Sequence, residues 1–481
     1  MNIKSIILFC TIVLCLLISC DPNSPYAPEC ITTTTTMPDT DWTVMLYSAG
    51  NCSLKDKLMG DLSEIKAGTN NNTTVIALAD NIYNTETSFC EAFSGTRLYQ
   101  IYNNDARRLS GGDILPEITL GEDVNLNTGD ADTFRRFVTF CKKYYPAEKY
   151  AVFVGGHGIG AIEEKKSRSD EPLRAMAQDS NNGNEDWIFT AELTDAFDYN
   201  ESIDLFVLDC CNMGFAEVAY QYRPGNDSFN TKYMVASLPQ QMGEGFPYDS
   251  IFSNVTPTMS AVDFGKLILQ KQTEYINSKA YWSWSYSQIM SMALYDCSKI
   301  EALKNAIDET VPYLANQKSL VQNTAAKSCG YWKRSYSYLQ STFDYMFDIY
   351  DIFTRLSDVS DDLSAEARAR CADVARLADE TVLASFLLKD PAALYQYPFE
   401  ENRSGLAIFL PQTDYLWRET LSYNAIDIVS SDTTMNGYGN FAWCSDGSTP
   451  SNNIADNWFE LLDSWSDTTN DESGGLNCYQ Y

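Results

Sequence analysis

The sequence predicts an α/β fold in which helices flank a mostly parallel sheet, followed by a largely helical C-terminal region. Short apolar runs typical of buried strands alternate with segments whose apolar residues recur every three or four positions, as on one face of a helix. This alternation is typical of βαβ units, whose parallel strands are covered by helices. With 481 residues, the chain is long enough for a main domain and an additional region.

The first elements lie between residues 41 and 102. Residues 43–48 form an apolar run closed by Gly50, which predicts a buried strand. A helix should follow, because the next apolar residues are spaced by four, four and three positions: Leu54, Leu58, Leu62 and Ile65. Residues 74–78 and 96–102 predict the second and third strands.

The next unit places the only histidine of the chain at a strand end. Residues 132–145 predict a helix, which Pro146 stops. Residues 150–154 predict a buried strand, and the glycines on both sides of His157 follow it. Glycines at this point allow a sharp turn and a close approach by a ligand.

A further unit places two adjacent cysteines at a second strand end. Residues 190–197 predict a helix, and residues 203–208 predict a strand that ends in Asp209, Cys210 and Cys211. A helix after Asn212 and a strand at residues 232–236 complete this part of the pattern.

Helical patterns predominate beyond residue 255. We therefore expect a catalytic domain at 41–255 and a mainly helical region at 256–481 that packs on it, with one late strand at 404–410. The predicted helices of this region are 262–277, 299–314, 343–356 and 364–388.

The N-terminus has the features of a bacterial lipoprotein signal. A charged Lys4 precedes the apolar run 6–18, and Ser19 stands before Cys20, which would receive the lipid. We assign residues 1–19 to the signal peptide and the Thr-rich residues 20–40 to a tether, which predicts a protein anchored in the cell envelope, periplasmic or at the surface. The alternative is an ordinary cleaved signal peptide that contains a cysteine.

The composition limits the partners and cofactors. The 34 Lys and Arg residues against 65 Asp and Glu give a formal charge of −31, which disfavours nucleic acid. The acidic excess favours cationic substrates weakly, and it is equally compatible with a solubilising surface. There is no CxxC pair among the 14 cysteines and only one histidine, so we expect no Cys/His metal site.

His157 and Cys211 are the candidate catalytic pair. They lie 54 residues apart, each at the carboxyl end of a predicted strand, where open α/β sheets bind their ligands. A thiol beside an imidazole is an activated nucleophile, and a helix N-terminus after Asn212 should lower its pKa further. The amides of Gly158 and Cys211 are the expected oxyanion donors. Cys210 should point the opposite way and pack as a small apolar residue.

Other chemistries are less well supported by the sequence. There is no GxSxG motif for a serine nucleophile. Paired carboxylates remain open as an alternative, because the chain contains many acids but no pair that stands out. A lone histidine can also be purely structural.

Several motifs resemble those of the clostripain family of cysteine peptidases (C11). A strand ending in His-Gly and a later strand ending in Asp-x-Cys are the layout of the wider group that includes caspases. The segments Tyr145-Pro146-Ala147 and Asp209-Cys210-Cys211-Asn212-Met213-Gly214 are similar to those of clostripain itself. The resemblance implies a caspase-like fold, a Cys-His dyad and endopeptidase activity on protein or peptide substrates.

The resemblance has further implications for specificity and processing. It implies cleavage after Arg or Lys, with Asp209 as an acidic wall of the S1 subsite. It also implies a zymogen that is cut between the dyad residues, for which Lys165, Lys166 and Arg168 are candidate sites. Some family members need calcium, and the acidic segment 179–186 would be its place here, although its spacing is not that of an EF-hand.

One segment departs from the family pattern. Where the family commonly has acidic residues after Ala236 and Ser237, this chain has Leu238, Pro239, Gln240 and Gln241. Glu244 is the next acid along the chain and the candidate to replace a lost carboxylate. The departure also leaves open an alternative function, a catalytically inactive, surface-anchored binding protein that retains the peptidase fold.

Overall fold

The computed structural model describes most of the chain between residues 40 and 466. The predicted signal peptide, nearly all of the predicted tether, Cys20, Lys165, Lys166 and Arg168 lie outside the described residues. Those are 40–82, 89, 91–158, 160–161, 176–180, 186–239, 241–278, 289–336, 341–359, 362–389, 403–412, 438, 441–445 and 455–466.

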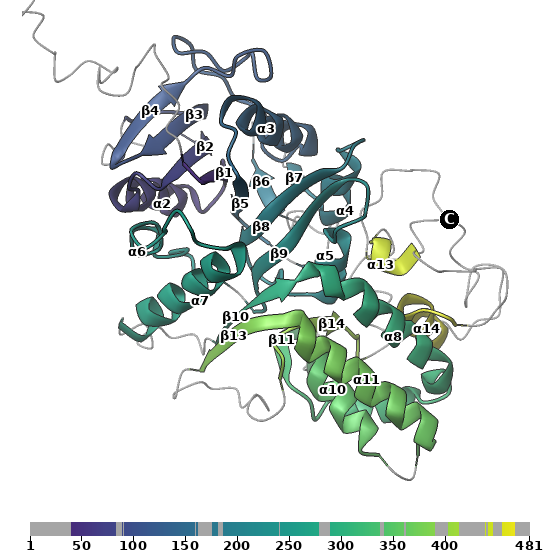
Figure 1. Cartoon of the computed structure of the whole chain (residues 1–481). Coiled ribbons are helices and arrows are strands. Elements are labelled where there is room, and N and C mark those ends of the chain that lie inside the picture. The colour runs from purple at the N-terminus through teal and green to yellow at the C-terminus, as the bar shows by residue number, and fades with distance from the viewer. Residues whose placement is uncertain are drawn as a thin grey trace, which may run out of the picture.

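A nine-stranded sheet forms the centre of the molecule, in the order β13-β10-β9-β8-β5-β1-β2-β3-β4 (Figure 1). Its five inner strands are parallel, as the βαβ pattern predicts. They are β1 (Trp42–Gly50), β2 (Thr73–Asn81), β5 (Lys149–Gly155), β8 (Glu201–Asp209) and β9 (Phe229–Ser237).

Antiparallel strands extend the sheet at both edges. On one side β2 pairs with β3 (Gly95–Tyr102), which pairs with β4 (Asp105–Leu109). On the other side β9 pairs with β10 (Ile289–Asp296), which pairs with β13 (Val382–Lys389). Because β10 and β13 come from beyond residue 255, the sheet continues across the boundary that separates the two regions in the sequence.

Helices cover both faces of the sheet. Successive side chains of β1 point to opposite faces, and alternate residues therefore lie in two separate hydrophobic cores, one on each face. On one face lie α2 (Lys55–Gly68), α6 (Tyr248–Phe252) and α7 (Ala261–Ser278). On the other lie α3 (Ala131–Tyr144), α4 (Thr190–Asp195), α5 (Ala216–Gln221) and α8 (Ile300–Leu314), the last after a short 3₁₀ turn, Cys297–Lys299 (Figure 1). The predicted α/β sandwich is therefore confirmed.

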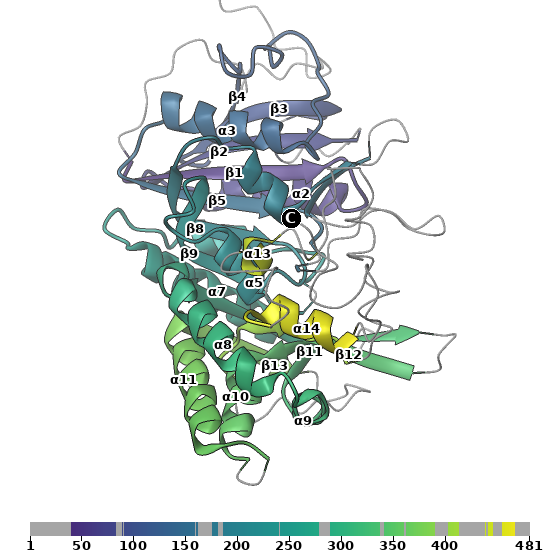
Figure 2. The ribbon, with the colours of Figure 1, turned by 90° about the vertical axis from the view of Figure 1, so that its right-hand side faces the viewer.

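The C-terminal region contains more strand than the sequence predicts. Its helices α8, α10 (Ile349–Ser357) and α11 (Ala365–Thr381) gather at the β10–β13 end of the sheet (Figure 2). A second, three-stranded sheet has the order β11-β12-β14. The remaining elements are β11 (Gly330–Tyr336), β12 (Ser341–Asp348), β14 (Ala407–Phe409), α9 (Lys318–Ala325), α13 (Ala442–Ser445) and α14 (Trp458–Ser466).

Two helix predictions in this region were wrong in part. The expected helix 343–356 begins only after β12, because the Asp348 carboxylate caps α10 by accepting from the amide of Asp351. The expected helix 364–388 ends at Thr381, and the apolar residues that follow it form β13 along the free edge of β10. Pairing with an open sheet edge overrides the helical preference of that apolar run.

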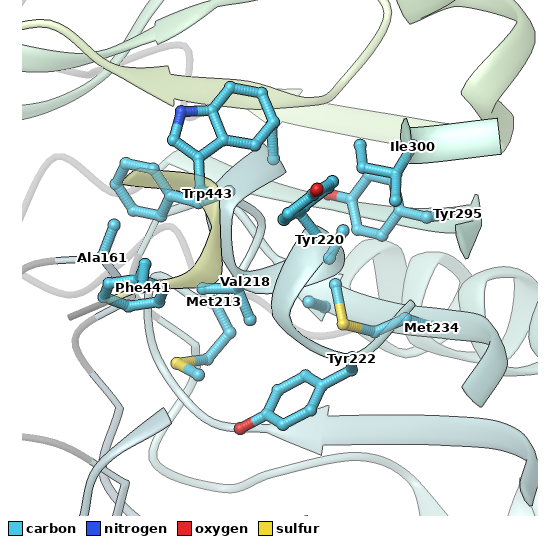
Figure 3. Packing of buried hydrophobic residues seen from close by; sticks show 14 of the residues in the cluster. Ala161, Met213, Val218, Tyr220, Tyr222, Met234, Tyr295, Ile300, Phe441 and Trp443 are labelled. Atoms are coloured by element: carbon cyan, nitrogen blue, oxygen red, sulfur yellow. The ribbon is translucent and has the colours of Figure 1, made fainter. Parts of the chain in front are cut away.

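The C-terminal segment packs on α5, the helix that follows Cys211 in the sequence. The Trp443 ring lies edge-on against Tyr220, with ring centroids 5.6 Å apart, and Figure 3 shows the two in one buried cluster with Met213. The Tyr438 hydroxyl donates to the buried carboxylate of Glu217 at 2.9 Å. Residues more than 200 positions further along the chain therefore hold this helix in place.

The cysteines and the hydropathy add two further facts. The eight described cysteines are all free thiols, and only Cys211 among them is not fully buried. None of the helices in the described part of the chain combines the length and apolar character needed to span a bilayer.

Candidate active site

The sheet brings the two predicted catalytic strand ends together. β5 and β8 are parallel neighbours, with Gly155 opposite Asp209 in the register. Their following loops therefore leave the sheet at the same edge and carry His157 and Cys211. Two residues that are 54 positions apart in the sequence are in this way held at one edge of a rigid scaffold.

Two residues that the sequence did not indicate surround the imidazole. The Nε2 atom of His157 lies 3.0 Å from the Ser53 hydroxyl, which comes from the loop between β1 and α2. The Trp187 ring lies beside the imidazole, with centroids 5.8 Å apart, and belongs to β7 (Asp186–Ile188). β7 forms a small hairpin with β6 (Met176–Asp179). Only the fold could identify both neighbours, because β1, β5 and β7 are distant in the sequence.

Gly158 packs directly against the backbone of Cys211. A Cβ atom at position 158 would lie 2.6 Å from the carbonyl oxygen and 3.0 Å from the amide nitrogen of Cys211, closer than real side chains approach. This position therefore requires glycine. The close contact places the amide groups of the two expected oxyanion donors in adjoining stretches of backbone.

The two neighbouring cysteines have different surroundings, as predicted. The Cys210 side chain is fully buried, and its thiol donates to the carbonyl of Val154 at 3.4 Å. Cys211 is partly exposed, and its Sγ accepts a hydrogen bond from the amide of Gln241 at 3.3 Å. The face shared by Asp209 and Cys211 is thus the one that meets Gln241.

The expected lowering of the thiol pKa by a helix N-terminus was wrong. Helix α5 begins only at Ala216, after a turn in which Asn212 has a φ of 58°. Burial instead raises the pKa of the Cys211 thiol to about 11, although the Gln241 amide opposes the shift. In this state Cys211 is a protonated thiol at neutral pH, covered by the segment that contains Gln241.

Asp209 lies beneath the same segment. Its Oδ1 accepts from the side-chain amide of Gln241 at 3.1 Å, and its Oδ2 accepts from the Tyr248 hydroxyl at 2.9 Å. Burial raises the pKa of Asp209 to about 6, while these donors act in the opposite direction. A carboxylate held in this way can receive a cationic group next to the thiol.

Three of the four residues that depart from the family pattern, Leu238, Pro239 and Gln241, lie among the described residues. Leu238 is fully buried in the core. The carbonyl oxygen of its neighbour Pro239 accepts a hydrogen bond from the backbone amide of Asn212 at 3.0 Å. The Glu244 carboxylate does not join Asp209, because it pairs with the Lys57 ammonium at 3.1 Å. Glu244 is therefore engaged elsewhere, and the compensation that the sequence suggested is not found there.

No metal site is evident in the parts of the chain that the structure describes, where no three His, Cys, Asp or Glu side chains are grouped to hold an ion. Most of the segment 179–186, to which the sequence assigned calcium, lies outside those parts.

With this geometry in place, comparison with known proteins identifies the family. The model of the Clostripain family matches residues 46–465 of the chain. The chain belongs to the clostripain family. This family member is 32% identical to clostripain from Hathewaya histolytica, over 91% of this chain and 89% of that protein. It is accordingly a cysteine endopeptidase.

Solved structures show the same fold. A secreted C11 cysteine protease from Bacteroides thetaiotaomicron, in complex with an irreversible peptide inhibitor, matches with a TM-score of 0.57 and 17% identity, covering 84% of this chain and 99% of that one. An inactive zymogen C11 protease from Parabacteroides distasonis matches with a TM-score of 0.51 and 20% identity, covering 79% and 94%. The clostripain-family chain shares its central architecture with both.

Proposed function

We propose that this endopeptidase works with a Cys-His dyad, Cys211 and His157, and cleaves after Arg or Lys. The observation that carries the dyad is the contact between the two strand-end loops, where Gly158 lies against the backbone of Cys211. The substrate is a protein or peptide, because the clostripain family consists of peptidases. A chain with a formal charge of −31 is unsuited to bind nucleic acid.

We assign each step of the reaction to one of these residues. The Ser53 hydroxyl forms a hydrogen bond with Nε2 of His157, and we assign to Nδ1 the role of taking the thiol proton. The sulfur attacks the scissile carbonyl carbon, and the amides of Gly158 and Cys211 bind the oxyanion, a contact worth roughly 3–4 kcal/mol. His157 then protonates the leaving amine, and a water molecule hydrolyses the thioester after giving a proton to His157.

The described state is consistent with a latent enzyme. Burial raises the pKa of the Cys211 thiol and keeps the nucleophile protonated, and the backbone of Gln241 lies against its sulfur. We propose that cleavage between His157 and Cys211, at Lys165, Lys166 or Arg168, accompanies activation. The similar structure from Parabacteroides distasonis is titled an inactive zymogen, which supports this order of events.

We also propose an envelope location. A lipid on Cys20 would anchor the enzyme in the bacterial cell envelope, and residues 20–40 would form the tether. The basic P1 preference is supported by Asp209, whose carboxylate is bonded to Gln241, the residue whose backbone amide contacts the Cys211 sulfur.

Labelling with an acyloxymethyl ketone that carries Arg at P1 tests the dyad. The adduct should form in the unmodified enzyme and in Cys210→Ala, and it should be absent in Cys211→Ala. If Cys210→Ala lost the labelling while Cys211→Ala kept it, the nucleophile would be Cys210 and not Cys211. If neither an Arg probe nor a neutral one labels Cys211, the alternative of an inactive binding protein takes the place of the dyad mechanism.

Self-processing is tested on the same proteins by mass spectrometry. A nick within residues 162–178 should be present in the active enzyme and absent in Cys211→Ala. A nick that persists in Cys211→Ala would show that another protease makes the cut.

A further inference from the structure

The carboxyl groups of Asp61 and Asp209 converge on one backbone position from two different elements. Asp61 lies in α2 and Asp209 ends β8, and both side chains are at least 94% buried, with 4% and 6% of their surface exposed. A Cβ atom on Gly245 would lie 2.9 Å from Oδ2 of Asp209 and 3.2 and 3.3 Å from the two carboxylate oxygens of Asp61. Gly245, with a φ of 70°, is therefore flanked by both acids.

The two carboxyl groups differ in how they are compensated. Asp209 accepts hydrogen bonds from Gln241 and Tyr248. Asp61, in contrast, lies within the electrostatic influence of two other acids, Asp209 and Glu64, and of one cation, Lys57. Burial of a carboxylate is costly, and burial together with the charges of Asp209 and Glu64 raises the pKa of Asp61. The surroundings of Asp61 therefore favour the binding of a proton or a cation by its carboxylate.

The nearest cation of the fold does not fill this position. Lys57 lowers the pKa of Asp61 through its charge, but its ammonium is bonded to Glu244 at 3.1 Å. Half of the Lys57 side chain is exposed, so it lies toward the outside of the site. The cationic side chain of a ligand would therefore compensate the two buried acids, as protonation of one of them does in the free enzyme.

The contacts of Gln241 mark the path by which such a ligand would enter. Its backbone amide lies 3.3 Å from the Cys211 sulfur, while its side-chain amide lies 3.1 Å from Asp209. Gln241 thus spans the distance from Cys211 to Asp209, with its backbone amide at the sulfur and its side-chain amide at the carboxylate. A P1 residue makes the same span, because its carbonyl must reach the sulfur while its side chain extends into S1.

We propose that Asp61 is a second specificity-determining carboxylate, which binds the basic P1 side chain together with Asp209. The inference rests on the proposed function. It assigns to α2 the acid that the family pattern would place after Ser237, where this chain has Leu238 in the core. The side chain of Gln241 leaves Asp209 when the substrate enters, and the charged group of P1 then bonds to both acids.

The test compares two fluorogenic substrates that differ only at P1, Arg in one and its neutral isostere citrulline in the other. In the full-length enzyme, Asp61→Asn should lower kcat/KM for the Arg substrate by about 10- to 100-fold, as expected for a lost hydrogen bond to a charged group. The citrulline substrate should be cleaved as before. Asp56→Asn is the matched control, because Asp56 is an exposed acid in the same helix.

A conservative variant and a binding measurement separate specificity from folding. Asp61→Glu keeps the charge and should retain the preference for Arg. In a Cys211→Ala background, Asp61→Asn should weaken the binding of a peptide that ends in Arg, and it should not affect the citrulline peptide.

The contrary outcomes are distinct. An equal loss on both substrates, or an unchanged Arg activity in Asp61→Asn while Asp209→Asn loses it, overturns the role of Asp61. A lack of turnover of both substrates by the unmodified enzyme, with no labelling of Cys211, overturns the dyad instead. The binding measurement still decides on Asp61 in that case.

Discussion

The Ser53 hydroxyl lies 3.0 Å from Nε2 of His157, and this contact joins the loop after β1 to the loop after β5. Because β1 and β5 are parallel neighbours, both loops leave the sheet at the same edge. The hydroxyl is the partner of Nε2, and the mechanism that we propose therefore assigns Nδ1 to the thiol. Ser53 is a positioning residue, since it acts through His157.

We expect Ser53→Ala to lower kcat by about tenfold, the effect of one lost hydrogen bond, and to leave KM unchanged. The physical reason is that the imidazole loses the hydrogen-bond partner of Nε2, while the residues that bind the substrate are unchanged. Steady-state kinetics over a range of pH checks this. Ser53→Thr keeps the hydroxyl and should restore most of the rate, whereas an unchanged kcat in Ser53→Ala would show that the contact has no role.

Gly158→Ala should reduce kcat by about 10²–10³-fold, the range found when an oxyanion donor is removed. The added Cβ atom would lie 2.6 Å from the carbonyl oxygen of Cys211, so the two amide groups must move apart. Gly60→Ala is the matched control, because a Cβ atom at position 60 would meet nothing within 4 Å. Single-turnover kinetics and the melting temperature are the measurements. Full activity in Gly158→Ala would contradict the packing argument.

The activity on basic P1 residues should fall in acid. The pKa of Asp209 is raised to about 6, so its carboxylate is ionised above that pH and becomes protonated below it. The value of kcat/KM for a P1 Arg substrate should therefore decline about tenfold for each pH unit below pH 6. This acid limb of the pH profile depends on the ionisation of the free enzyme, because kcat/KM refers to the enzyme before substrate binds. The titratable groups that interact with this acid are Asp61, Tyr248, Cys210 and Cys211, while Glu64 and Lys57 act on Asp61 beside it.

A neutral P1 substrate provides the control for this pH dependence. It should lack the acid limb, because no charge in S1 acts on it. In Asp209→Asn the limb should also change for the Arg substrate. Identical profiles for both substrates would assign the limb to another group, such as His157.

Alkylation of Cys211 by iodoacetamide should be slow at neutral pH in the uncleaved chain. With a thiol pKa of about 11, roughly one molecule in ten thousand is a thiolate at pH 7. The alkylation rate should then rise about tenfold per pH unit between pH 8 and 10. Peptide mass mapping measures it, with Cys211→Ala as the blank. A plateau near pH 7 would mean that His157 already stabilises the thiolate.

Trp443→Ala should destabilise the enzyme by about 3–5 kcal/mol, the usual effect of a large aromatic residue lost from a core. The Trp443 ring is 1% exposed and packs on Tyr220 of α5, so its loss loosens the helix that follows the nucleophile. Urea denaturation measures the change. Ile82→Ala is the control, since Ile82 is 41% exposed. An effect below 1 kcal/mol would show that the C-terminal segment does not support α5.

The central part of the fold was predictable because its signals are local. The apolar run 150–154 and the glycines around His157 indicate a buried strand and its turn, and the structure has β5 at Lys149–Gly155. The C-terminal strands were not predictable in this way. The apolar residues after Thr381 suit a helix as well as a strand, and only the open edge of β10 makes them β13.

The sequence by itself determined the candidate nucleophile and base, because one histidine and one Asp-x-Cys motif stand at the ends of two predicted strands. It also showed where the pocket departs from the family. The tertiary structure alone decided which residues surround that pair. Ser53 and Trp187 come from segments that carry no motif, the loop after a parallel strand and a separate antiparallel pair, and tertiary packing alone brings them to His157. Asp61 of α2 likewise reaches Asp209 only through the fold. It also decided the protonation state of the nucleophile, since burial beneath Gln241 raises the thiol pKa that the sequence had led us to expect low.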